Sequence, residues 1–103
     1  MLKSYNALPL SLACLFTFNA HAYLVNGRMF LEDYEKRKPA ITGYVEGVSD
    51  MGNSNLFCIP AGTGTRQLKQ IALDYMNSNS DMLEHPAATL ITRAYNKAFP
   101  CTE

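Results

Sequence analysis

The sequence has little of what metal sites and nucleic-acid-binding proteins need. Its 103 residues include two histidines, His21 and His85, and three cysteines, Cys14, Cys58 and Cys101. None of these forms the closely spaced ligand pairs that structural zinc requires. Nine basic residues balance nine acidic residues, and the two signs are intermixed, so no basic stripe favours nucleic acid. We therefore expect no metal, no cofactor and no nucleic-acid partner.

The chain also lacks an apolar run long enough to cross a membrane. The run from Ala7 to Phe18 holds about a dozen residues, whereas a membrane-spanning helix needs roughly 20. A basic residue precedes this run and the small-residue site Ala20-His21-Ala22 follows it, which predicts a signal peptide cleaved after Ala22. Lipid attachment at Cys14 is the alternative, but the residues before it fit a lipid-attachment box poorly. We expect residues 1–22 to be removed, residues 23–103 to form one exported domain, and no membrane association after cleavage.

Loss of the signal peptide leaves an even number of cysteines, Cys58 and Cys101. In an oxidising compartment such a pair forms a disulfide, and two unpaired buried thiols are the alternative. A small domain has a small core, and closing this loop should add about 2–4 kcal/mol to its stability. The sequence therefore predicts one disulfide.

Apolar spacing predicts two helices that flank the cysteine pair. The first runs from about Arg66 to Asn77, with Thr65 as its N-cap, and the second begins at Pro86 and stops before Pro100. A short linker makes them antiparallel, which brings the start of the first beside the end of the second, where the cysteines are. The residues expected on the buried faces are Leu68, Ile71, Ala72, Tyr75 and Met76 in the first helix, and Ala87, Ile91, Ala94, Tyr95 and Ala98 in the second.

Two further helices are predicted upstream, over about Asn26 to Lys36 and Ala40 to Met51. The second contains Gly43 and Gly47, and glycine inside a helix costs roughly 0.5–1 kcal/mol relative to alanine. Close packing within the chain or against a second copy of the chain would offset that cost. The expected fold is all-α, a small bundle of about four helices with one disulfide closing the C-terminal helical hairpin.

Two polar segments are candidates for binding a partner, because loops on rigid scaffolds often carry recognition. Solvated connectors are the alternative interpretation of both. The first candidate closes the helical hairpin and comprises Asn77, Ser78, Asn79, Ser80, Asp81 and Glu84. The alternative loop follows the glycine-bearing helix and comprises Asn53, Ser54 and Asn55.

Catalytic groups are sparse. A thiolate beside an imidazole is the minimum for a cysteine nucleophile, so a catalytic interpretation would start from Cys58 and His85. We expect the disulfide to occupy Cys58 and the hairpin to hold His85 near its far end. Carboxylates such as Glu46, Asp50 and Asp74 show no spacing that selects an acid and base pair. We expect that the protein is not an enzyme.

Several ordered motifs between Thr42 and Cys101 resemble the immunity proteins of type VI secretion amidase effectors, the Rap/Tai-like family. The strings that carry the resemblance are Gly43-Tyr44-Val45-Glu46-Gly47-Val48-Ser49-Asp50, Phe57-Cys58-Ile59-Pro60, His85-Pro86-Ala87-Ala88 and Ala98-Phe99-Pro100-Cys101.

The resemblance implies a periplasmic, mostly helical protein, commonly a homodimer with an internal disulfide. It also implies a partner, a papain-like cysteine amidase that cuts peptidoglycan and whose active site is blocked by a loop of the immunity protein. A periplasmic structural or regulatory binding domain for an endogenous envelope protein is the alternative function.

Overall fold

The computed structural model describes residues 24–102, and each regular element in this part of the chain is a helix. The four α-helices are α2 (Gly27–Glu35), α3 (Ala40–Gly52), α4 (Thr65–Ser78) and α5 (Ala87–Ala98), with a short 3-10 helix, η3 (Ser80–Met82), between the last two. The predicted all-α bundle of four helices is confirmed. The predicted signal peptide lies outside the described residues.

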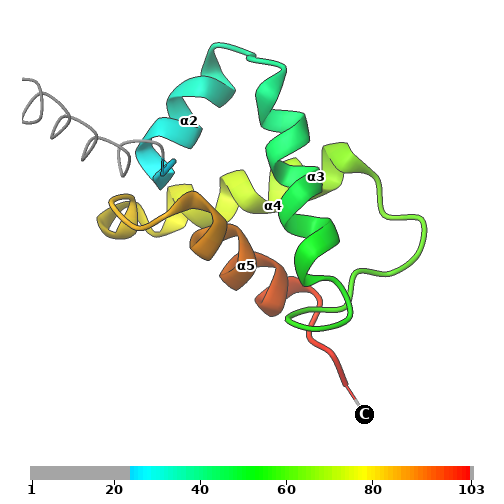
Figure 1. Ribbon diagram of the computed structural model, residues 1–103. Coiled ribbons are helices and arrows are strands. Elements are labelled where there is room, and N and C mark those ends of the chain that lie inside the picture. The colour runs from blue at the N-terminus through cyan, green and yellow to red at the C-terminus, as the bar shows by residue number, and fades with distance from the viewer. Residues whose placement is uncertain (1–23, 103) are drawn as a thin grey trace, which may run out of the picture.

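Helices α4 and α5 lie side by side and antiparallel, and α3 crosses them (Figure 1). Helix α2 turns sharply into α3 and packs against the start of α5. Among the described helices, none is both long and apolar enough to cross a membrane. The buried apolar residues come from all four helices and from one loop residue, Phe57; they are Phe30, Ile41, Val45, Phe57, Leu68, Ala72, Met76, Ala87, Leu90, Ile91, Ala94 and Tyr95.

Three local predictions about helix ends and faces were wrong. Thr65 is the first residue of α4 and its N-cap is Gly64, because the Thr65 hydroxyl bonds Glu46 Oε2 at 3.0 Å instead of a free amide. Pro86 is the N-cap of α5, one residue before the helix starts. Ala98 is exposed, because the helix ends there and the chain turns towards Cys101.

One end of the α4–α5 hairpin, which we call the turn end (residues 79–86), is tied to the start of α2. The Gly27 amide donates to the His85 carbonyl at 3.0 Å, and the Arg28 amide donates to the Leu83 carbonyl at 3.1 Å. A Cβ added at Gly27 would lie 2.7 Å from Leu90 Cδ1, so only glycine fits this crossing without a shift. The turn end is therefore packed into the fold by backbone contacts.

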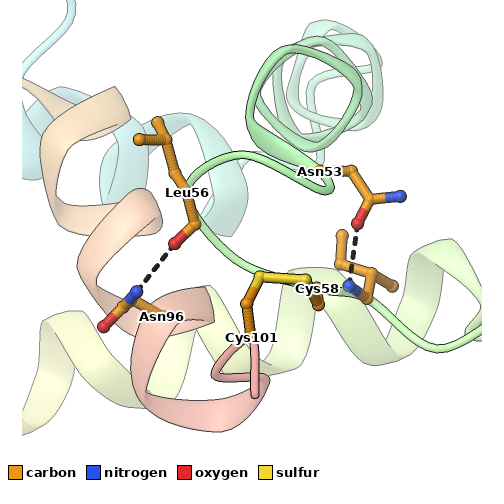
Figure 2. The surroundings of a disulfide bond; sticks show 6 residues. Asn53, Leu56, Cys58, Asn96 and Cys101 are labelled. Atoms are coloured by element: carbon orange, nitrogen blue, oxygen red, sulfur yellow. Dashed lines mark hydrogen bonds between the residues drawn. A yellow bond between two sulfur atoms is a disulfide. The ribbon is translucent and has the colours of Figure 1, made fainter. Parts of the chain in front are cut away.

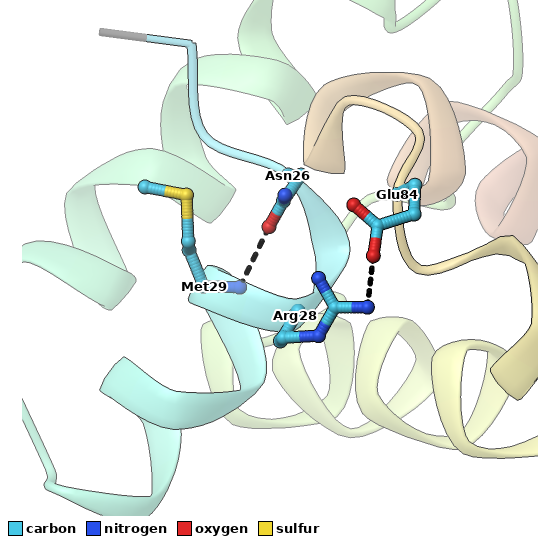
Figure 3. Close-up of polar contacts among 4 residues, drawn as sticks. All are labelled: Asn26, Arg28, Met29 and Glu84. Carbon is cyan, nitrogen blue, oxygen red and sulfur yellow. Dashed lines mark hydrogen bonds and ion pairs between the residues drawn. The ribbon is translucent and has the colours of Figure 1, made fainter. Parts of the chain in front are cut away.

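Side chains complete the same contact. Asn26 caps α2 by accepting from the Met29 amide at 2.8 Å, and Arg28 forms an exposed ion pair with Glu84 (Figure 3). The hydrogen bond from Arg28 holds the pKa of Glu84 below its usual range. Both partners are exposed, so solvent screens the pair.

Candidate functional site

The opposite end of the hairpin, which we call the disulfide end, is held covalently. Cys58 and Cys101 form the predicted disulfide, with their Cα atoms 5.0 Å apart. The Cys58 amide also donates to the Phe99 carbonyl at 2.8 Å, so a backbone hydrogen bond runs beside the bridge. The predicted pairing and hairpin topology are both confirmed.

The loop between α3 and Cys58 is fixed at this end by a buried aromatic residue. Phe57 is fully buried, and its ring meets the Tyr95 ring edge-on with centroids 5.2 Å apart. The ring also lies against Gly52, where an added Cβ would come within 2.5 Å of Phe57. Phe57 therefore anchors residues 53–56 on the end of the core.

Hydrogen bonds fix the shape of the same loop (Figure 2). Asn53 Oδ1 accepts from the Ile59 amide at 2.8 Å, and Asn96 Nδ2 on α5 donates to the Leu56 carbonyl at 2.7 Å. Ser54 adopts a left-handed backbone conformation, with φ of 75°, and its amide donates to the Phe57 carbonyl at 2.7 Å. The loop is thus pre-organised rather than a free connector.

This loop borders a shallow apolar groove of about 550 Å³ between α3 and the start of α5. Two of its large apolar side chains are unusually exposed, Met51 at 80% and Leu56 at 55%. Apolar surface of this kind marks an interaction site more often than scattered single residues do. We call this feature the apolar groove. It is lined by Gly43, Tyr44, Gly47, Val48, Met51, Gly52, Leu56, Ala88 and Thr92.

Gly43 and Gly47 lie on this groove and face open space. An added Cβ at either position would meet nothing within 4 Å. Close packing against a helix of the same chain, one of the two explanations offered for these glycines, is therefore wrong. Packing against a second copy stays a prediction.

The first candidate loop divides between elements. Asn77 and Ser78 belong to the last turn of α4, Ser80 and Asp81 belong to η3, and all four are exposed. Asn79 is half-buried and donates from Nδ2 to the Tyr75 carbonyl at 2.8 Å. Exposed Glu84 pairs with Arg28. All of these residues except Asn79 are therefore exposed, and the nearby backbone at Leu83 and His85 is tied to α2.

Two tyrosines have raised pKa values because they are removed from water. Burial raises the pKa of Tyr44, which lines the apolar groove, although a hydrogen bond with the Ala88 backbone lowers it in part. Burial raises the pKa of Tyr95 to about 12, and a hydrogen bond with Ser49 acts in the opposite direction. The Tyr95 hydroxyl also donates to the Leu68 carbonyl at 2.9 Å. Both phenols are neutral at physiological pH and serve packing.

The chemistry-bearing residues do not converge. Cys58 lies in the disulfide, and His85 lies at the turn end beside α2. Over residues 24–102, no three His, Cys, Asp or Glu side chains come together in a way that could hold a metal ion. The described surface offers an apolar contact area, and its geometry suits binding a protein.

A family model of the Rap1a immunity proteins matches residues 28–101. The chain belongs to the Rap1a immunity protein family. The match begins at the second residue of α2 and covers α3, α4, α5 and both cysteines of the disulfide. Neither a curated protein nor a solved structure matches the chain. Membership indicates an immunity protein that binds a toxin effector, and the resemblance to an immunity family is confirmed at this level.

Sequence reasoning missed the apolar residues of this family member that border its loop. Met51 and Leu56 were assigned no role, although Met51 follows Gly43 and Gly47 at helical spacing on one face. Leu56 is a large apolar residue after a polar Gly-Asn-Ser-Asn turn, and that isolation was the available signal. Leu56 and Phe57 are both large and apolar, and the sequence does not show which of them is buried.

Proposed function

We propose that this protein is a periplasmic immunity protein that binds a type VI secretion peptidoglycan amidase and occludes its active site, so that the producing cell is protected. Membership of the Rap1a immunity proteins over residues 28–101 carries this proposal. The resemblance of the motifs around Gly43, Phe57 and His85 to amidase immunity proteins supports the choice of toxin. The protein acts as a stoichiometric inhibitor and not as an enzyme.

Action in the periplasm is supported by two features of the chain. The pattern before Tyr23 is typical of a cleaved signal peptide. The Cys58–Cys101 disulfide suits an oxidising compartment and would be reduced in most cytosols.

The loop at the disulfide end is the toxin-contacting segment in this proposal. Phe57, Asn96 and the disulfide hold it in one shape, so little ordering entropy is lost when it enters a cleft. Leu56 at its end is large, apolar and 55% exposed, as an anchor residue at an interface should be. The polar side chains Ser54 and Asn55 are free to meet the backbone groups that line a protease-like cleft.

A second copy of the chain would cover the neighbouring helix face. A Cβ added at Gly43 or Gly47 would meet no atom from another part of the subunit within 4 Å, so a helix from another subunit could approach their backbone closely. The homodimer would enlarge the platform that carries the loop.

Size-exclusion chromatography with light scattering tests the dimer. Gly47→Leu should convert a dimer to a monomer with its helicity retained, because a side chain there meets nothing within the subunit. A monomeric wild-type protein would refute the dimer, as would an unchanged dimer mass in the variant.

Inhibition of amidases tests the function itself. The purified oxidised protein is titrated against candidate amidases, beginning with any encoded beside its gene, with peptidoglycan fragments as substrate. Complete loss of cleavage at one immunity chain per toxin is the expected result. No effect on any candidate would overturn the proposal and favour an endogenous envelope partner instead.

A further inference from the structure

A second surface feature lies away from the apolar groove, in the corner between the α2–α3 turn and α4. It is a pocket of about 360 Å³, and three of its lining residues carry positive charge, Arg37, Lys38 and Lys69. None of its lining residues is acidic. Lys69 comes from α4, some thirty positions beyond the other two, so the fold gathers this charge from separate elements.

Two of the three cations have a polar partner nearby, one in the pocket wall and one outside it. Lys69 Nζ donates to Thr42 Oγ1 at 3.2 Å, which places its ammonium group at the pocket wall. Lys38 Nζ lies 3.5 Å from Asp33 Oδ1, so part of its charge is balanced by α2. Within residues 24–102, Arg37 forms no salt bridge and is exposed. One guanidinium is therefore free to bind a ligand at the pocket mouth.

The backbone at Arg37 is unusual. Helix α2 ends with the Arg37 amide donating to the Tyr34 carbonyl and the Lys38 amide donating to the Asp33 carbonyl, each at 3.0 Å. This is the Schellman arrangement, in which the residue in the left-handed conformation is most often glycine. Here that residue is arginine, with φ of 57°. A strained non-glycine residue at a helix end is a reason to look for a function of its side chain.

We propose that this pocket binds the carboxylate of an acidic side chain in a peptide segment of a protein partner. The guanidinium of Arg37 can hold a carboxylate through two parallel hydrogen bonds, and the Lys69 ammonium adds a third donor. Buried Ile41 and half-buried Tyr34 supply an apolar wall for the methylene groups behind the carboxylate. This inference does not rest on the amidase proposal, because the pocket lies apart from the apolar groove.

Nuclear magnetic resonance titration of the purified oxidised protein tests the site. The probe is acetyl-Gly-Glu-Gly-amide, its matched control is acetyl-Gly-Gln-Gly-amide, and inorganic phosphate is a third ligand. We expect saturable shifts at the Arg37, Lys38 and Thr42 amides with the glutamate peptide, with a dissociation constant of about 1–10 mM. The glutamine peptide should give none.

Variants separate a binding role from a structural one. Arg37→Gly should weaken glutamate-peptide binding about tenfold while the Tm stays equal or rises, because glycine is unstrained there. Lys69→Gln should weaken binding by a similar factor. Arg93→Gln on α5 removes the same charge from an exposed position outside the pocket and should leave binding within about twofold.

Four results would overturn the proposal. The first is absence of saturable shifts with the glutamate peptide at about 10 mM, and the second is equal binding of the glutamine peptide. The third is an Arg93→Gln effect as large as that of Arg37→Gly, which would indicate diffuse electrostatic attraction. Binding of phosphate without the glutamate peptide would equally reject a carboxylate as the ligand.

Discussion

The two ends of the α4–α5 hairpin are built differently. At the turn end, residues 79–86 are tied to α2 by backbone hydrogen bonds and by the close contact at Gly27. At the disulfide end, the Cys58–Cys101 bridge and buried Phe57 hold the chain, and the loop over residues 53–56 stays exposed. The turn end is tied to a neighbouring helix, whereas in our proposal the disulfide end presents its loop to a partner.

The comparison teaches that a loop's polarity is a poor guide to its availability. Both candidates are polar, but the segment Asn77–Glu84 is tied to α2, because its Leu83 carbonyl accepts from the Arg28 amide. The shorter loop is held by its neighbours so that Leu56 can stay exposed without collapsing onto the core. Rigid support and apolar exposure together favour recognition.

Removing the disulfide should cause the largest loss of stability. The local loosening should be confined to the disulfide end of the hairpin. The double variant Cys58→Ser with Cys101→Ser should lose about 4 kcal/mol of unfolding free energy, since the bridge closes a loop with a sequence separation of 43. Urea denaturation measures the loss. In this variant, native-state exchange of the amide hydrogens should speed up at positions 58 and 99 before it does at Gly27 and Arg28. Equal acceleration at the two ends would show that they are not independent.

Replacing either packed glycine, Gly27 or Gly52, with alanine should lower the unfolding free energy by less than loss of the disulfide does. The two losses should be similar, although one glycine lies at each end. Gly27→Ala meets Leu90 and Leu83, and Gly52→Ala meets the Phe57 ring, so each should lose about 1–3 kcal/mol through overpacking. Gly43→Ala is the control within a single subunit, where it should gain about 0.5–1 kcal/mol because its Cβ meets nothing there. Thermal and urea denaturation give all three values. Stabilisation by Gly27→Ala would refute the tight crossing at the turn end.

Tyr95→Phe should cost about 1 kcal/mol at neutral pH, because it removes the hydrogen bond to the Leu68 carbonyl at the disulfide end. The folded-state pKa of Tyr95 is raised, so its contribution is fully present below the ordinary phenol pKa of about 10 and is lost as pH rises through about 12. The wild-type protein should therefore lose stability over this alkaline range more steeply than the variant. If the unfolding free energies of the two proteins changed with pH in parallel, the claim that Tyr95 has a raised pKa would be contradicted.

Glu84→Gln should have the smallest effect, because the Arg28–Glu84 pair at the turn end is exposed. The pKa of Glu84 is lowered, so its small stabilisation is present above the ordinary carboxyl pKa and disappears as pH falls through the lowered value. The Tm of the two proteins should differ slightly at neutral pH and coincide at strongly acidic pH. A large difference in Tm at neutral pH would mean that this ion pair, and not the backbone hydrogen bonds, holds the turn end against α2.

The regular part of the fold was predictable from the sequence, because helix periodicity and proline positions act locally. The apolar stripe from Leu68 to Met76 and the even cysteine number led to the hairpin and its bridge, and both are confirmed. The cap at Thr65 was wrong, because its hydroxyl found a partner on another helix, Glu46. Nothing local in the sequence indicates that contact.

The candidate site was less predictable, because it also depends on contacts between residues that are far apart in the sequence. Gly27 and Gly52 are indispensable to packing and Gly43 and Gly47 are not, yet only the neighbours in space distinguish the two pairs. Leu56 and Phe57 are adjacent and similar in chemistry, but one is exposed and the other is fully buried. Likewise, Lys69 joins Arg37 and Lys38 through tertiary packing of α4 against α3.

Amidase inhibition by one variant from each end tests the central claim most directly. Leu56→Asp at the disulfide end should raise the inhibition constant about 100-fold or more with the Tm nearly unchanged, because an exposed anchor becomes a charge. Asp81→Ala at the turn end, also exposed, should leave the constant within about twofold. The reverse order, or full inhibition by both variants, would contradict the assignment of recognition to the disulfide end.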